Sequence, residues 1–255
     1  MRRNKRWVLG LGLVGLLAVP LAAQSVPITG QGTWESTLQG RDLNGDGIFD
    51  AYYDTTLDIT WLADANAAGT TMTWANANAW AAALDVNGVT GWRLPTVAPI
   101  NGTSFNTTLS TNGTTDRGTA TTTTDGSNGG WRDASGDPVS EMGHMFYVTL
   151  GNLGVCDPLL AWCTPQSGSG LINTADFLNV QSNLYWSGTE LGADDAWDFF
   201  FGNGVQDVGG KNLDGLFAWA VRSGDVSAAA VPAPGVLGLF GIGLLGLLGA
   251  VRRRR

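Results

Sequence analysis

The stretch "DLNGDGIFD" has the residue types and the spacing of a calcium-binding loop. In an EF-hand loop, oxygen ligands stand at positions 1, 3, 5, 7 and 9, a glycine at position 6 permits the sharp turn, and a bidentate Glu closes the site at position 12. The residues that match the ligand positions, with a backbone carbonyl at position 7, are Asp42, Asn44, Asp46, Ile48 and Asp50. Gly47 stands at position 6, but position 12 is Tyr53. The pattern predicts a weak calcium site at best, and an Asp/Asn/Gly-rich β-turn explains the same residues without a metal.

The two cysteines, Cys156 and Cys163, enclose the short loop "CDPLLAWC". An even and closely spaced pair predicts a disulfide if the chain folds in an oxidising compartment. A redox-active pair is the alternative, but no basic residue or histidine lies nearby in the sequence to lower a thiol pKa. We therefore expect a local structural disulfide.

Three carboxylates lie close enough in the sequence to suggest the acid and base of a glycoside hydrolase: Asp194, Asp195 and Asp198. That chemistry needs one carboxyl group with a raised pKa at a set separation from the second, and sequence alone does not define either property. Solvated loop carboxylates are the simpler interpretation, because aspartates are mostly exposed. We expect no catalytic residues in the chain.

The single histidine, His144, precedes the apolar run "MFYVTL". One histidine cannot build a zinc site of the usual composition, and neither Ser187 nor Ser223 has a histidine nearby in the sequence for a Ser-His-Asp relay. We expect His144 to lie at the end of a strand, with its hydrogen bonds satisfied.

The sequence patterns around these residues predict both helices and strands, and therefore an α+β fold. Trp74, Ala77, Ala81 and Leu84 recur at helical spacing, after Thr73 as the expected N-cap. An Asn-Gly pair at 87–88 is expected to end this helix.

Strands are predicted where aromatic and β-branched residues gather between Gly and Asp. In "LDITWL" (57–62) the apolar residues alternate with a period of two, as in a half-buried strand. By contrast, the segment 103–130 has eleven threonines in 28 residues, and we expect it to form a long exposed loop. The other segments predicted as strands are "AYYD", "HMFYVTLGNLG", "YWSGTE", "AWDFFFGNG" and "LFAWAVRSGD".

The N-terminus has the three parts of a secretory signal peptide. A basic "MRRNKR" precedes an apolar run at 7–19 and the small residues of "PLAAQ", which places cleavage between Ala23 and Gln24. An uncleaved anchor is the alternative. We expect residues 1–23 to be removed and the remainder to be exported.

The C-terminus combines a Pro-x-Pro motif, an apolar run of sixteen residues at 236–251 and an arginine cluster. As a helix the run would measure about 24 Å, which is short for a membrane core of about 30 Å, so it would span the membrane only marginally. The motif and cluster residues are Val231, Pro232, Ala233, Pro234, Arg252, Arg253, Arg254 and Arg255.

This tail (228–255) resembles the PEP-CTERM sorting signal of Gram-negative bacteria, with Ala233 where that family usually has Glu. The resemblance implies a C-terminal transmembrane helix that stays in the inner membrane only in transit. It also implies removal near the prolines by an exosortase-type membrane protease, and release to the cell surface or the extracellular matrix. A permanent single-pass anchor is the alternative.

Between the two ends the chain is strongly acidic. Six basic residues stand against 22 acidic ones, a net charge of about −16. Such a surface repels phosphate backbones and anionic lipid, so we exclude nucleic acid as a partner.

The ordered set "TWANANAWAAAL…GWRLPT…YWSGTE…AWDFFFGNG…AWAVRSGD" resembles the C-terminal domain of the Lcl collagen-like adhesin, a relative of C-type-lectin-like and formylglycine-generating-enzyme folds. The resemblance covers residues 51–227, after an N-terminal strand and turn segment at 24–50. It implies an irregular antiparallel sheet, one or two helices, long loops, and structural roles for Trp92, Trp186 and Trp219.

The resemblance does not extend to catalysis, because the cysteine pair matches no formylglycine-type active-site motif. We therefore expect an exported, non-catalytic protein of the cell envelope, exopolysaccharide or biofilm matrix that binds carbohydrate or another matrix component. We expect no cofactor other than calcium at the loop described above. The alternatives are a divergent formylglycine-type oxidase or a hydrolase, and a purely structural matrix protein.

Overall fold

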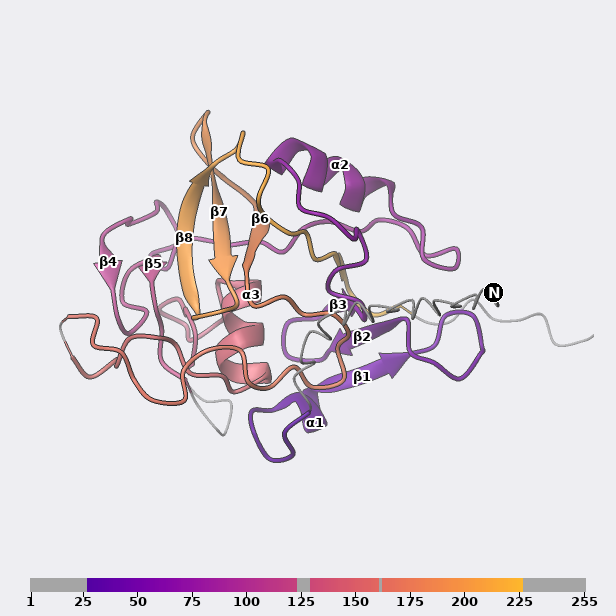
Figure 1. Ribbon diagram of the computed structural model, residues 1–255, viewed down its shortest axis with the longest axis horizontal. Helices are drawn as coiled ribbons and strands as arrows, with labels where there is room; N and C mark the ends of the chain where they lie inside the picture. The colour runs from indigo at the N-terminus through magenta and orange to yellow at the C-terminus, as the bar shows by residue number, and fades with distance from the viewer. Residues whose placement is uncertain (1–26, 123–128, 161, 227–255) are drawn as a thin grey trace, which may run out of the picture.

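Two small sheets on opposite sides of the molecule, with helices between and beside them, make up the fold in the computed structural model (Figure 1). The structure describes residues 27–122, 129–160 and 162–226. The expected signal cleavage site and the sorting tail lie outside these ranges. Within them no helix has the length and apolar character needed to cross a bilayer. The α+β class is thus confirmed, and the transmembrane helix stays a prediction for the tail.

The first sheet is antiparallel throughout, in the order β1-β2-β3-β9. The predicted strands at 51–54 and 57–62 are present, but the expected alternation in the second is wrong, because all four residues of β3 are buried. Thr60 is tolerated there because its hydroxyl donates to the Gly224 carbonyl (2.8 Å). The strands are β1 (Leu38–Arg41), β2 (Ala51–Asp54), β3 (Ile59–Leu62) and β9 (Val221–Ser223).

The second sheet has the order β4-β5-β8-β7-β6, parallel between β4 and β5 and antiparallel elsewhere. "YWSGTE" and "AWDFFFGNG" provide β6 and β7 as predicted, whereas only three residues of "LFAWAVRSGD" form a strand, β9. The strands are β4 (Leu109–Ser110), β5 (Arg117–Gly118), β6 (Leu184–Leu191), β7 (Asp195–Phe200) and β8 (Val205–Gly210).

The threonine-rich segment is only in part the exposed loop that its composition predicts, because residues 103–109 are mostly exposed but the part that follows is partly buried. It contains β4 and β5, and Asp116 and Thr119 are buried. The Asp116 carboxylate accepts the backbone N–H groups of Ile100 (2.8 Å) and Asn106 (2.6 Å), while its carbonyl accepts the side-chain amide of Gln206 (2.7 Å). Buried polar groups need hydrogen-bond partners, and these bonds provide them, so this part of the segment can be buried.

The predicted helix is present as α2 (Trp74–Ala83), with Ala77 and Ala81 buried. Thr73 precedes it without capping it through its side chain. The Asn-Gly pair at 87–88 lies beyond the helix end, in the turn between Val86 and Val89, where both residues have positive φ. Two residues with positive φ are typical of a type I′ turn, so the pair serves a different purpose from the one predicted.

The segment "HMFYVTLGNLG" is helical where a strand was expected. α3 (Glu141–His144) continues without a break into the π-helical turn η1 (Met145–Thr149), and all five residues of η1 are buried. A helix that is buried on every side shows no amphipathic pattern, so its sequence looks like that of a buried strand. A further short helix, α1 (Trp34–Thr37), precedes β1.

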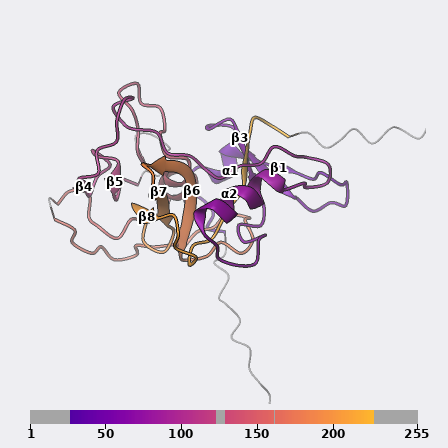
Figure 2. The same ribbon diagram turned by 90° about the horizontal axis from the view of Figure 1, so that it is seen from above.

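Figure 2 shows the strands of the two sheets on opposite sides of the molecule, and the main aromatic core contains buried residues of both sheets and of η1. Trp92, Trp186 and Trp219 are buried as expected. Their indole N–H groups donate to the backbone carbonyls of Val89, Met72 and Leu62 at 2.8–2.9 Å. Each tryptophan therefore fills the core and also fixes a neighbouring loop, which confirms their structural role.

Candidate functional site

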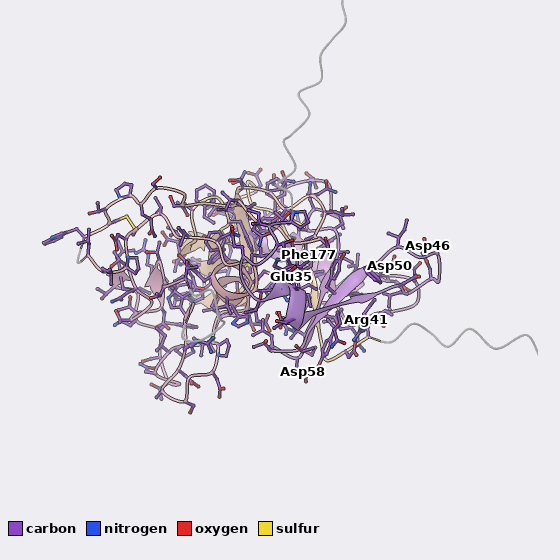
Figure 3. All side chains as sticks on the ribbon, turned by 90° about the horizontal axis from the view of Figure 1, so that it is seen from below. Glu35, Arg41, Asp46, Asp50, Asp58 and Phe177 are labelled. Carbon is purple, nitrogen blue, oxygen red and sulfur yellow. A yellow bond between two sulfur atoms is a disulfide. The ribbon has the colours of Figure 1, made fainter. Side chains whose placement is uncertain are left out.

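A groove of about 260 Å3 lies beside β1, the edge strand of the first sheet. It combines exposed aromatic surface with carboxylate groups from segments far apart in the sequence. Figure 3 labels two of its residues, Glu35 from α1 and Phe177 from the turn before residue 178. The full lining is Trp34, Glu35, Leu38, Gly40, Phe49, Tyr52, Asp176 and Phe177.

The floor of the groove comes from strand alternation. Leu38 and Gly40 line it, so the residues between and after them in β1 face the opposite side of the sheet. Gly40 is paired with Tyr52, and a Cβ at Gly40 would lie 2.4 Å from the ring of Phe49. Glycine is therefore required here for space, since it lets the Phe49 ring lie directly on the strand.

Three aromatic rings form one continuous wall. The Phe49 and Tyr52 centroids are 5.8 Å apart, those of Tyr52 and Phe177 are 5.0 Å apart, and both pairs are edge-to-face. Phe177 continues the series to the buried Trp219 (4.9 Å). At the other end Phe49 is 48% exposed. The wall is thus the solvent-facing end of the aromatic core, held in place by that core.

Tyr52 is held in its neutral form. Burial, with the nearby negative charge of Asp176, raises the pKa of Tyr52 to about 12. Its hydroxyl donates to the Asp176 carbonyl (3.4 Å). Trp34, which makes no ring contact with the wall within the described ranges, donates its indole N–H to the Ile28 carbonyl (3.3 Å). The indole N–H of Trp34 and the hydroxyl of Tyr52 therefore already donate to backbone carbonyls of the protein.

Two carboxylates complete the lining. Glu35 accepts the Gly30 N–H through Oε2 (2.8 Å), and its Oε1 has no hydrogen bond to any described residue. The carboxylate of Asp176 likewise has no hydrogen bond to any described residue. No Lys or Arg side chain of the described ranges lines the groove. Arg41 of the same strand is held by Asp225 (2.7 and 2.8 Å). The groove therefore offers aromatic side chains, of which Phe49 is the most exposed of the wall, and negatively charged hydrogen-bond acceptors.

The predicted calcium loop is closed by its own hydrogen bonds. Asp42 accepts the Gly47 N–H through Oδ2 (2.8 Å), the main cause of its lowered pKa, and Asp46 accepts the Ile48 N–H (2.8 Å). Asn44 donates from its side chain to Asp46 (3.0 Å). These Asx-type turns are what the β-turn alternative predicts.

Asp50, the last candidate ligand, is turned to other partners. Its Oδ2 accepts the Leu43 N–H (2.7 Å) and its Oδ1 accepts the Asn87 side-chain amide (3.0 Å). Within the described ranges no group of three or more His, Cys, Asp or Glu residues is arranged to hold a metal. Calcium at this loop stays a prediction for titration to test.

The structure separates the three candidate hydrolase carboxylates. Asp194 and Asp195 are exposed, whereas Asp198 is 4% exposed on the opposite face of β7 from Asp195. Asp198 is paired across the strands with Asp207, which itself forms an ion pair with Arg117. Burial, followed by the charge of Asp207, raises the pKa of Asp198 to about 7, against the opposing effect of Arg117. The three therefore do not face a common site.

His144 is also unlike its prediction. It lies in a helix, is buried, and neither ring nitrogen has a hydrogen-bond partner among the described residues. Burial lowers its pKa to about 3, so the ring is neutral at pH 7. Ser187 donates to the Pro95 carbonyl (2.9 Å) and Ser223 accepts from Arg93 (3.4 Å). The two hydroxyls thus have structural partners.

The predicted disulfide between Cys156 and Cys163 is present. Its loop exposes three large apolar side chains, Leu159 (90%), Leu160 (43%) and Trp162 (81%). The loop does not contribute to the lining of the groove.

Sequence reasoning missed the groove, although its residues carry a signal. Trp34-Glu35 and Asp176-Phe177 are adjacent pairs of an aromatic and an acid, and Phe49 is followed by an acid as well. Each pair is common by chance, and only the fold brings them together. Comparison with family models, with curated proteins and with solved structures finds no match for this chain. The site is therefore interpreted from its own geometry.

Proposed function

We propose that this chain is an exported, non-catalytic protein of the cell surface or extracellular matrix that binds carbohydrate. The observation that carries the proposal is the groove beside β1, in which aromatic side chains and free carboxylates form one lining. Sugars present apolar C–H faces that stack on aromatic rings, and hydroxyl groups that donate to carboxylates. Typical ligand clefts measure roughly 300–1,000 Å3, so a groove of about 260 Å3 holds one sugar unit and leaves the rest of a polymer outside.

Export and sorting are the second part of the proposal. The N-terminal signal and the Pro-x-Pro tail support passage through the inner membrane and processing by an exosortase-type protease. The lectin-like resemblance of residues 51–227 supports a binding role by analogy of fold. The C-terminal mass of the native protein tests the sorting step, and a native protein that retains Arg255 would instead be anchored in the membrane.

The binding role is tested with a glycan array and two matched variants of the full chain. Phe49→Ala removes the exposed end of the aromatic wall and is expected to weaken carbohydrate binding by about 1 kcal/mol or more, several-fold in Kd. Trp162→Ala removes a still more exposed aromatic outside the groove, 81% exposed against 48% for Phe49, and should leave binding unchanged. An equal loss of carbohydrate affinity in both variants would contradict the groove as the binding site. No binding to any glycan on the array would favour a purely structural matrix protein.

A hydrolase is the alternative that one observation favours. Asp198 has a raised pKa and one carboxylate oxygen, Oδ1, without a partner among the described residues, as a general acid requires. Its burial argues against contact with substrate. Release of reducing sugars by the wild type, abolished in Asp198→Asn, would replace the binding proposal with an enzymatic one.

A further inference from the structure

The free polar side-chain atoms in the groove are all acceptors. The indole N–H of Trp34 and the hydroxyl of Tyr52 already donate to protein carbonyls. What remains is one oxygen of Glu35 and the whole carboxylate of Asp176. A ligand group that suits this lining must donate several hydrogen bonds and need no donor in return, which describes a protonated amine.

Charge and ring placement favour the same group. The two carboxylates meet no Lys or Arg in the described lining, and the chain between the expected processing sites carries a net charge of about −16. A cation is also attracted to the faces of aromatic rings within about 6 Å.

We infer that the groove selects polysaccharide built from hexosamine units whose amino groups are unacetylated and protonated. This inference rests on the proposed carbohydrate-binding function and defines its ligand class. Acetylation would remove the charge and two donors and would add a carbonyl acceptor, for which the groove side chains have no free donor. N-acetylated and neutral sugars therefore bind more weakly.

The test is calorimetric titration of the full chain, in detergent, with three tetrasaccharides that share the same glycosidic linkage. They are the tetramers of glucosamine, of N-acetylglucosamine and of glucose. The glucosamine tetramer is expected to bind at least about tenfold more tightly than the other two, which corresponds to about 1.4 kcal/mol. Equal affinity for all three would overturn the amine preference and leave carbohydrate binding intact. Failure of all three to bind would overturn both. A lysine tetrapeptide that binds as tightly as the glucosamine tetramer would overturn the assignment to a sugar.

Variants locate the effect in the groove. Glu35→Gln and Asp176→Asn, alone and together, should weaken binding of the glucosamine tetramer, the double variant by about tenfold, with little effect on the glucose tetramer. Asp214→Asn removes another exposed carboxylate, outside the groove, and should change neither affinity. The two single variants guard against misfolding of the double one, and a melting curve of each variant confirms its fold. Unchanged glucosamine binding in folded Asp176→Asn and Glu35→Gln would overturn the inference.

Discussion

Replacing Asp198 with Asn should remove one large contribution to the pH dependence of folding. The carboxyl is buried opposite Asp207, and these surroundings raise its pKa from 3.8 to about 7. Because the folded state holds this proton more tightly than the unfolded state, the contribution of Asp198 to stability is highest below about pH 4 and is lost as the pH rises towards about 7. The difference between the two pKa values corresponds to about 4 kcal/mol as an upper limit. Asn has nearly the same shape and does not ionise, so the variant escapes this loss.

Urea unfolding of both proteins at about pH 4, 5.5, 7 and 8 measures the effect. The buried amide itself costs free energy at every pH, so the quantity to compare is the change in stability between about pH 4 and 8. Two other buried groups contribute equally to both proteins: Asp54, whose pKa burial raises to about 6, in the same sense as Asp198, and His144, whose pKa burial lowers to about 3, in the opposite sense. Asp195→Asn, an exposed change on the same strand, is the control and should follow the wild type. Parallel pH profiles for wild type and Asp198→Asn would refute the assignment of a raised pKa to this carboxyl.

Three further predictions concern local features. Cys156→Ser with Cys163→Ser should cost at most about 2.5 kcal/mol in the free energy of unfolding, because the disulfide closes only a short loop, and urea unfolding checks this. Gly118→Ala should destabilise the fold by more than about 1 kcal/mol, since φ is +116° and a Cβ would lie 2.0 Å from a carbonyl of β4; Gly215→Ala, with open space around it, should be nearly neutral. Calcium at about 10 mM should leave the melting temperature unchanged if the turns at 42–50 are complete without metal, and a clear rise would establish the loop as a site.

The parts of the fold that the sequence predicted correctly are those with a local pattern. α2 has apolar residues at helical spacing, β6 and β7 are aromatic runs between glycines, and two cysteines in a short loop have each other as the nearest partner. In each case, the residues that determine the structure lie within a few positions of one another. Local propensity and tertiary packing then favour the same conformation.

The errors occur where tertiary packing decides. Met145 to Thr149 are buried all round, so their apolar run indicates burial but not the type of element. Composition also placed the threonine-rich segment at the surface, although Asp116 turns part of it inward through hydrogen bonds to positions 100 and 106, and through Gln206 of β8. Neither the partners nor the burial can be derived from the composition of the segment itself.

The groove illustrates the same limit at the site. Its two aromatic–acid pairs are separated by about 140 positions, and the fold brings them together at the solvent-facing end of one aromatic core. The decisive residue is Gly40, because any side chain there would displace Phe49 from the strand and break the exposed wall. A glycine in an edge strand ordinarily suggests a weak or bulged strand. Here its register opposite Tyr52 gives it a different role, and only the pairing of β1 with β2 reveals that role. Conversely, the fold occupies or buries the carboxylate oxygens of the turn at 42–50 and of Asp198, which attracted attention in the sequence, whereas Glu35 and Asp176 keep oxygens free to meet a ligand.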